Sequence, residues 1–138
     1  MKKKWPWIAI AALVLVSGTL LIFSMSSRPF QSLKSEEIQE AAVRLTPPDI
    51  RLAVSKEETE KLAEILRRVV VYRKDDSYKE YAGQYVEFTI TKTDGTVTTV
   101  AAYNPLLIID GVGYRTKYGP CEELNHLANN LRAGKEGI

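Results

Sequence analysis

The chain opens with a long apolar run. No charged residue occurs between Trp5 and Phe23, and three lysines (Lys2, Lys3 and Lys4) stand directly before this run. At about 1.5 Å per residue the run would form a helix of roughly 28 Å, close to the ~30 Å hydrocarbon core of a bilayer. The pattern predicts a membrane-spanning signal anchor within residues 1–23. The lysines place the N-terminus in the cytoplasm and the remaining chain outside.

Two fates are open for this segment. A cleaved signal peptide has an apolar stretch of about 7–15 residues followed by small residues, and the best cleavage site here is Ser24-Met25-Ser26. We expect a retained single-pass anchor that contacts the lipid bilayer through residues 5–23; secretion after cleavage is the alternative. Residues 24–35 are rich in serine and predict a short tether.

Two strands and a helix are predicted next. Ala41, Val43 and Leu45 alternate with other residues within 38–45, and residues 50–54 alternate cleanly between apolar and other positions. Pro47-Pro48 separates the two runs, because a proline disfavours the helical conformation of the residue before it. Ser55 followed by Glu58 is a capping box, so we expect a helix over residues 56–68, then a strand near residues 69–72.

A β-hairpin is predicted around Asp94-Gly95. The two residues lie between alternating runs at 85–93 and 96–103, and Asp-Gly favours a two-residue type I′ turn. Such a loop would pair Ile90 with Thr99, Phe88 with Ala101 and Val86 with Tyr103. Residues 106–109 and 113–118 predict two further strands around a turn at Asp110-Gly111.

The last predicted element is a helix. Pro120 fits its first turn, Gly119 is a candidate cap and Gly134 would end it. The expected fold is α+β, a mostly antiparallel sheet with two helices packed on one face. The sequence thus divides into an anchor (1–23), a tether (24–35) and an extracytoplasmic α+β domain (36–138).

Charge and rare residues exclude several classes of function. The chain has 19 Lys and Arg and 17 Asp and Glu, and residues 1–28 hold four of the cations and no acid. Residues 29–138 therefore carry a net charge of −2, which does not fit a nucleic-acid partner. One cysteine and one histidine exclude a multi-thiol zinc site and any site built on two imidazoles. We expect no metal and no cofactor.

Candidate catalytic groups have simpler structural explanations. Cys121 shares a helix stripe with Leu124 and Ala128, which predicts a buried thiol rather than a nucleophile, whereas His126 would face solvent. The glutamates of the first predicted helix suit capping and i,i+4 ion pairs; they are Glu57, Glu58, Glu60 and Glu64. Asp75, Ser77 and Glu80 do not have the spacing of a calcium loop. Gly111, Gly113 and Gly119 are explained as turn glycines. We expect no catalytic residue, and no enzyme.

Tyrosine is the one anomaly of composition. All seven tyrosines lie between residues 72 and 118, and cations are interleaved among them, namely Arg73, Lys74, Lys79, Arg115 and Lys117. Tyr and Arg carry much of the binding energy at protein interfaces, although tyrosines also suit the edges of a sheet core. The candidate ligand or partner surface comprises Tyr78, Tyr81, Tyr114, Arg115, Lys117 and Tyr118.

Four short segments carry a resemblance to other proteins. They are Glu-Tyr-Ala-Gly-Gln-Tyr (80–85), Ala-Tyr-Asn-Pro (102–105), Ile-Asp-Gly-Val-Gly-Tyr (109–114) and Lys-Tyr-Gly-Pro-Cys-Glu (117–122). The stretch resembles small uncharacterised domains of exported or membrane-anchored proteins of Gram-positive, Clostridia-like bacteria, over about residues 37–132. The resemblance implies a location and a domain boundary, and no activity.

These features favour a membrane-tethered, non-catalytic binding or sensing module outside the membrane. Its partner would be an envelope protein or a small ligand. The alternatives are a proteinaceous inhibitor, a structural subunit of an envelope complex or, with least support, a cell-envelope hydrolase that uses carboxylates.

Overall fold

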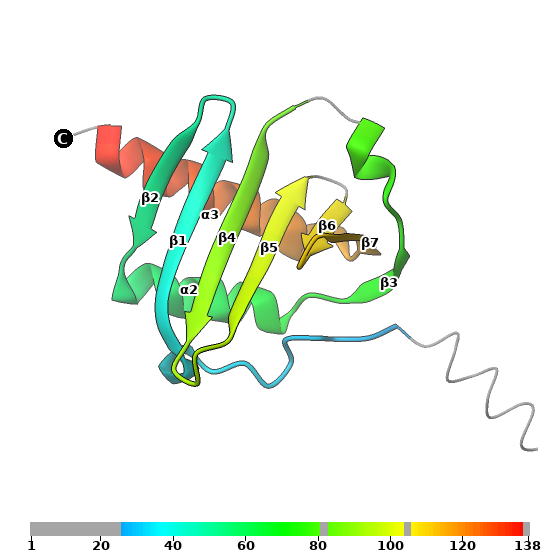
Figure 1. The fold of residues 1–138 in the computed structure, drawn as a ribbon, viewed down its shortest axis with the longest axis horizontal. Helices are drawn as coiled ribbons and strands as arrows, with labels where there is room; N and C mark the ends of the chain where they lie inside the picture. Colours follow the sequence, from blue (N-terminus) through cyan, green and yellow to red (C-terminus); the bar gives the residue numbers. More distant parts are fainter. Residues whose placement is uncertain (1–25, 81–82, 104–105, 137–138) are drawn as a thin grey trace, which may run out of the picture.

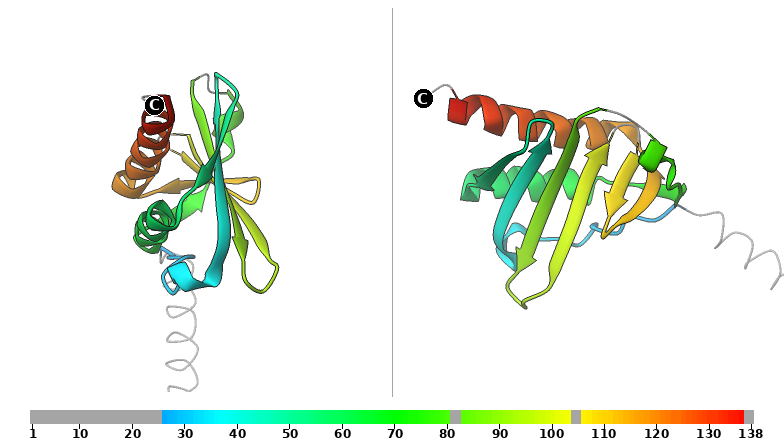
Figure 2. Two further views of the ribbon diagram at one scale, coloured as in Figure 1. Left: turned by 90° about the vertical axis from the view of Figure 1, so that its left-hand side faces the viewer. Right: turned by 45° about the horizontal axis from the view of Figure 1, so that its top comes forward.

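The structure is a computed structural model that describes residues 26–80, 83–103 and 106–136. Seven strands form one antiparallel sheet in the order β2-β1-β4-β5-β6-β7-β3. Helices α2 (Lys56–Arg67) and α3 (Tyr118–Glu136) lie on the same face of this sheet (Figures 1 and 2). The predicted α+β fold is therefore confirmed. The predicted membrane segment lies outside the described residues. Within the part of the chain that is described, no helix is long and apolar enough to cross a membrane.

The first strands and the first helix follow the sequence pattern. Strands β1 (Ile38–Thr46) and β2 (Ile50–Val54) pair around the two prolines. Helix α2 starts after Ser55, whose side chain accepts a hydrogen bond from the Glu58 backbone N–H at 3.3 Å and so satisfies one of the free donors at the helix start. Strand β3 (Val71–Lys74) follows and forms one edge of the sheet.

The main core lies between the helices and one face of the sheet. Alternate residues of β1, β4 (Tyr85–Lys92), β5 (Val97–Tyr103) and β6 (Leu106–Ile109) point toward the helices. Phe88, at the centre of β4, is fully buried, as are Leu62 of α2 and Leu124 of α3. Replacing a fully buried phenylalanine by alanine lowers the free energy of unfolding by about 3–5 kcal/mol. The layer between helices and sheet therefore supplies much of the stability of the domain.

The predicted register of the β4–β5 hairpin was wrong by one residue. Phe88 pairs with Val100, and Ile90 pairs with Thr98. The Gly95 N–H donates to the Lys92 carbonyl at 3.0 Å, and the Lys92 N–H donates to that of Thr96 at 2.8 Å, so the loop has three residues rather than two. Because side chains alternate along a strand, this shift moves Ala101 and Tyr103 to the face away from the helices.

The two Asp-Gly pairs form different turns. Asp110 and Gly111 both have positive φ (49° and 84°), and Ile109 pairs directly with Val112 of β7 (Val112–Thr116), as a two-residue type I′ turn requires. At the other site only Gly95 has positive φ. The Asp94 carboxylate there accepts hydrogen bonds from the N–H and hydroxyl of Thr96, at 2.9 and 2.6 Å, which stabilises the wider loop.

Two boundaries also differ from the prediction. Helix α3 begins at Tyr118, so Pro120 does lie in its first turn but Gly119 is inside the helix, and the helix continues past Gly134 to Glu136. In the predicted tether, Ser27 exchanges two backbone hydrogen bonds with Val71, at 2.9 and 2.7 Å. Phe30 and Leu33 are buried there (9% and 5% exposed). From Ser27 onward this segment packs on the domain.

The different roles of Gly95 and Gly134 give a matched pair of substitutions. Gly95 has φ +90°, and no atom lies within 4 Å of the place that a Cβ would take, so Gly95→Ala meets no neighbour but strains the backbone. We expect it to lower the free energy of unfolding by about 1 kcal/mol. Gly134→Ala also meets nothing within 4 Å and lies in a helix, so it should be neutral or stabilising by up to about 1 kcal/mol.

Urea unfolding of residues 26–138, followed by circular dichroism, compares the two variants. Equal effects of both substitutions would contradict the turn that we assign to Gly95.

Candidate functional site

A cluster of tyrosines lies on the sheet face that carries no helix. Tyr85 of β4 and Tyr103 of β5 stand with ring centroids 5.7 Å apart at an angle of 54°. Together with Tyr78 they pack around the buried residues Ala101 and Ile108. We call these five residues the tyrosine cluster. It is a second, smaller apolar core, and it exists because the hairpin register turns Ala101 and Tyr103 to this side.

Tyr78 is fixed by close packing against a glycine. It belongs to the short 3₁₀ helix η2 (Ser77–Glu80), and its hydroxyl donates to the Gly111 carbonyl at 3.3 Å. A Cβ on Gly113 would come within 2.8 Å of the Tyr78 ring and would collide with the backbone oxygen of Asp75. The absence of a side chain at Gly113 thus allows η2 to lie directly on β7.

Two aspartates tie the same loop to β7. The Asp75 N–H donates to the Gly113 carbonyl at 2.8 Å, and the Gly113 N–H donates to Asp76 Oδ1 at 3.1 Å. Arg115 Nε donates to Asp75 Oδ2 at 2.7 Å. Hydrogen bonds from the side chain and backbone of Ser77, and then from Arg115, lower the pKa of Asp75 to about 2. These contacts order the loop that carries Tyr78.

Tyr85 remains a neutral phenol over the whole physiological range. Burial, followed by the nearby negative charge of Glu87, raises its pKa to about 12. Its hydroxyl lies 3.5 Å from Glu87 Oε2 and donates to it. The rim of the cluster therefore presents one phenol donor next to one carboxylate.

Beyond the tyrosine cluster, the centre of this face is made of short side chains. Thr89 pairs with Ala42 on one side and with Thr99 on the other, and these residues are partly or fully exposed. We call this side of the sheet, which Figure 1 views from the front, the uncovered face. Besides the tyrosine cluster it comprises Ala42, Arg44, Arg51, Ala53, Glu87, Thr89, Thr91, Val97 and Thr99.

The structure does not bring the six predicted site residues onto one surface. Tyr78 and Arg115 lie on the side of the uncovered face, whereas Tyr114, their neighbour on β7, packs against the main core. Lys117 and Tyr118 lie at the junction of β7 and α3 and are exposed. Tyr81 is outside the described residues. The prediction omitted Tyr85 and Tyr103, and the signal that places them together is the hairpin register.

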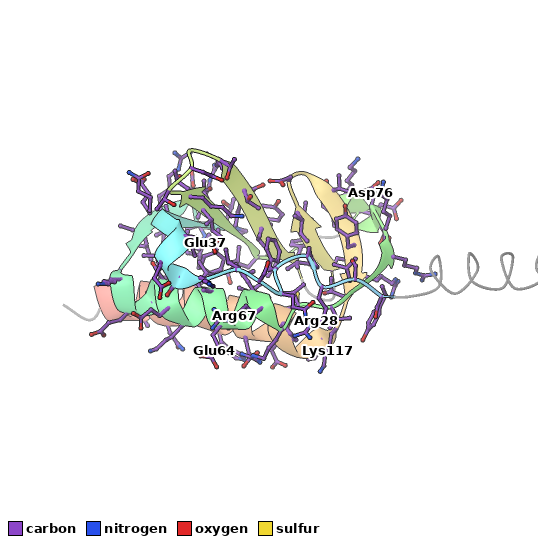
Figure 3. All side chains as sticks on the ribbon, turned by 90° about the horizontal axis from the view of Figure 1, so that it is seen from below. Arg28, Glu37, Glu64, Arg67, Asp76 and Lys117 are labelled. Atoms are coloured by element: carbon purple, nitrogen blue, oxygen red, sulfur yellow. The ribbon has the colours of Figure 1, made fainter. Side chains whose placement is uncertain are left out.

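Figure 3 shows the lower edge of the domain, where Arg28, Arg67 and Lys117 lie near one another. Arg28 Nη2 donates to the Arg67 carbonyl at 3.0 Å, and Arg67 Nη1 donates to that of Leu33 at 2.9 Å. Arg28 and Lys117 also line a cavity of about 660 Å³. These contacts attach the N-terminal segment to the end of α2 and to the start of α3.

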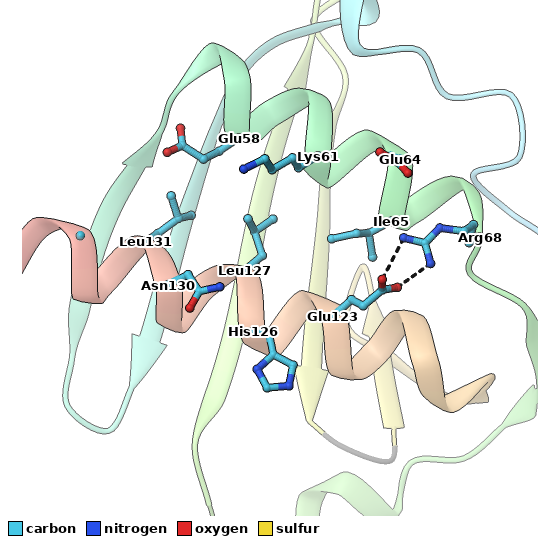
Figure 4. A pocket seen from close by; sticks show the side chains of 11 residues that line it. Glu58, Lys61, Glu64, Ile65, Arg68, Glu123, His126, Leu127, Asn130 and Leu131 are labelled. Carbon is cyan, nitrogen blue, oxygen red and sulfur yellow. Dashed lines mark hydrogen bonds and ion pairs between the residues drawn. The ribbon is translucent and has the colours of Figure 1, made fainter.

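A groove of about 610 Å³ runs between the two helices (Figure 4). Ile65, Leu127 and Leu131 form its apolar floor, and charged residues of both helices line its rim. At one end Arg68 donates two hydrogen bonds to Glu123, at 2.6 and 3.1 Å. At the other end Glu58 has a buried Oε2 with no hydrogen-bond partner among the described residues.

The groups that could perform acid–base or nucleophilic chemistry are separated and constrained. The Cys121 thiol is buried and donates to the Leu106 carbonyl at 3.4 Å; burial raises its pKa to about 11. His126 is exposed and contacts Glu122 at 3.4 Å. Within the described ranges no three residues of the types His, Cys, Asp and Glu are grouped as a metal site would need.

Comparisons of the chain with protein-family models, with curated proteins and with solved structures find no match. The site therefore has to be interpreted from its own geometry.

The environment of Cys121 predicts an unreactive thiol. Because a pKa of about 11 keeps the thiol protonated at pH about 8 and only thiolates are nucleophilic, a disulfide reagent should modify native protein very slowly and urea-unfolded protein at once. Absorbance at the thiol–reagent wavelength gives both rates. Rapid modification of the native protein would contradict the buried position.

The lowered pKa of Asp75 predicts that part of the free energy of unfolding is lost at acidic pH. A carboxylate with a lowered pKa stabilises the fold fully above its usual pKa of about 4, and this contribution is lost as the pH falls toward 2. We expect Asp75→Asn to be less stable than wild type at neutral pH, with the difference narrowing between pH about 4 and about 2. Urea unfolding across this range measures it. A difference that stays constant would show that Asp75 does not act through its charge.

Proposed function

We propose that this protein is a non-catalytic binding module, held on the outer side of a membrane by its N-terminal segment, and that the uncovered face binds a protein partner. The observation that carries the proposal is that one side of the sheet is left without a helix and bears an ordered tyrosine cluster, in which Tyr103 is buried and Tyr78 and Tyr85 are half-buried and so partly accessible. Tyrosines on a fixed surface contribute large contact area at low entropy cost. The membrane location rests on the apolar run from Trp5 to Phe23 and the lysines before it.

The dimensions of the uncovered face suit a moderate interface. The eight residues of β4 span about 27 Å, and the five strands from β2 to β6 span about 19 Å, at the usual rises and spacings of strands. The projected area is on the order of 500 Å², compared with about 800 Å² that each partner buries in a standard interface. A partner would thus cover the whole face and also contact the loops around it.

The uncovered face is the broad side of a sheet, which favours a protein over a small ligand, because small-molecule sites are concave and partly enclosed. Within the described residues, three cavities lie elsewhere, beside the helices and at the start of β1. One observation supports a small ligand as the second candidate. The interhelical groove has an apolar floor and the unpartnered carboxylate oxygen of Glu58, which would suit a small molecule with a hydrogen-bond donor.

Two groups that could act in catalysis are poorly suited to acid–base chemistry near neutrality. A general acid or base works best with a pKa near the operating pH. The pKa of Asp75 is about 2 and that of Cys121 is about 11, so both keep one protonation state around neutrality. An inhibitor or a structural subunit would use the same face, and a stable stoichiometric complex would distinguish either from a transient sensor.

The proposal predicts where a partner can be cross-linked. A photoreactive phenylalanine analogue at Thr89 or Thr99 in full-length protein, expressed in its native host, should give one adduct of discrete mass. Thr99→Arg should abolish the adduct formed from position 89, because a long charged side chain at the centre of the face would obstruct the partner. Immunoblotting after irradiation measures both results.

Matched positions on the helix side control for random collision. The analogue at the exposed residue Glu57 of α2 should give no adduct, and Glu57→Arg should leave the adduct from position 89 intact. If Glu57 and Thr89 give the same adducts, or if the Thr99→Arg variant keeps them while it folds normally, the uncovered face is not the binding surface.

A further inference from the structure

The edge of the domain at which the chain leaves toward its N-terminus has an unusual surface. Strand β3 forms this edge, and Ser27 is hydrogen-bonded to it through Val71. Four cations and two tyrosines lie along this edge, on β3, on the N-terminal segment and at the junction of β7 and α3. Because Arg73 pairs with Arg115 and Lys74 with Tyr114, the cations of β3 flank the edge strand on both sides of the sheet. We call these six residues the exit surface: Arg28, Tyr72, Arg73, Lys74, Lys117 and Tyr118.

The two tyrosines of the exit surface are exposed, although large aromatic side chains are usually at least partly buried. Tyr72 is 57% exposed and Tyr118 is 55% exposed, and they are two of the three large hydrophobic residues that stand out in solvent within the described part of the chain. The tyrosines of the tyrosine cluster, in contrast, are buried or half-buried. A tyrosine with its ring in solvent suits the polar–apolar boundary of a bilayer, where aromatic residues concentrate.

The cations of the exit surface are not neutralised by the fold. Arg73, Lys74 and Lys117 form no ion pair with any described residue, and the Arg28 side chain donates to a backbone carbonyl, which carries no formal charge. Of the nearby acids, Asp75 pairs with Arg115 and Glu123 with Arg68, whereas Asp76 accepts from the Gly113 N–H and Glu122 contacts His126, so none of the four forms an ion pair with a cation of the exit surface. Unpaired cations on one edge contrast with the net negative charge of residues 29–138.

The chain length places this edge next to the predicted membrane segment. Three residues, 24–26, separate Phe23, the last of the apolar run, from Ser27. The four steps from Phe23 to Ser27 reach at most about 14 Å even when fully extended, and the headgroup layer is about 5–8 Å thick on each side of the hydrocarbon core. Whatever path these residues take, Ser27 and its neighbours on β3 lie within or just above the headgroups once the apolar run spans the bilayer.

We infer that the exit surface rests on anionic lipid headgroups and thereby fixes the orientation of the domain on the membrane. This inference depends on the anchoring that we propose above. The cations attract anionic headgroups, an interaction that acts within a Debye length of the surface, and the short connection holds them there. The two tyrosines insert at the headgroup level.

Site-directed fluorescence on full-length protein tests the orientation. In a Cys121→Ala background, Tyr72→Cys and Tyr118→Cys carry a fluorophore, and the protein is reconstituted in vesicles of equal phosphatidylcholine and phosphatidylglycerol that contain a lipid with a nitroxide on its headgroup. The control is Glu57→Cys, ten residues before Arg67 and thus about 15 Å along α2 from the carbonyl that Arg28 binds. Both leaflets carry the quencher, so the extent of quenching does not depend on the direction in which the protein inserts into the vesicle.

We expect most of the fluorescence at positions 72 and 118 to be lost and that at position 57 to remain. Flotation of the vesicles after an alkaline carbonate wash reports anchoring separately. Protein that floats but is quenched equally at all three positions overturns the orientation and leaves the anchor intact. Protein that does not float overturns the membrane location in the proposed function, and the inference with it.

A charge variant tests the lipid chemistry. Lys74→Glu with Lys117→Glu should reduce quenching at position 72 in the mixed vesicles, as should vesicles of phosphatidylcholine alone. The matched control is Lys56→Glu with Lys61→Glu on α2, which should change nothing. If quenching at position 72 is the same in both kinds of vesicle and in both double variants, the short connection alone holds the domain and anionic lipid has no part.

Discussion

The alternation of side chains along the three central strands is the constraint on which the rest of the structure depends. Val43, Phe88 and Val100 face the helices from adjacent strands and are buried to 1% exposure or less. The helices cover only this side. Because the side-chain period of a strand is two, burying these residues also decides which residues face the other way. The composition of the uncovered face is therefore a consequence of how the core is packed.

The uncovered face is ordered by contacts outside that core. The tyrosine cluster packs on the opposite side of β5 and β6, and η2 closes over it because Gly113 has no side chain. An antiparallel sheet can expose one face to water without cost to its backbone hydrogen bonds. An apolar cluster that is half covered and held in place by Asp75 and Asp76 is a preformed surface, and little entropy would be lost if a partner bound there.

The sequence predicts the helices and strands well, and it predicts the pairing register between neighbouring strands less well. Ser55 and Glu58 mark the start of α2, and the alternation at residues 50–54 marks β2, because capping and periodicity are local effects. The hairpin register depends on whether Asp94 adopts positive φ. It does not, since its carboxylate is engaged by Thr96, whereas Asp110 in the same dipeptide does. One residue of difference in the loop then moves Tyr103 to the other face of the sheet, so the turn type at Asp94-Gly95 decides where this tyrosine lies.

A second difference concerns β7. Tyr114 and Arg115 belong to the same predicted surface, although neighbours on a strand point to opposite faces.

The two proposed surfaces are geometrically compatible. The exit surface lies along β3, at one edge of the sheet, whereas the uncovered face is the broad side (Figure 1). A domain that rests on the membrane by its β3 edge stands with the sheet upright, so both the uncovered face and the interhelical groove stay open to the surrounding medium. Had the chain left the domain through the uncovered face, the membrane would have covered the tyrosine cluster. The backbone hydrogen bonds between Ser27 and Val71 leave only residues 24–26 between the domain and the apolar run, which limits how far the domain could turn over. The proposed anchoring at this edge would therefore keep the proposed binding face available to a partner.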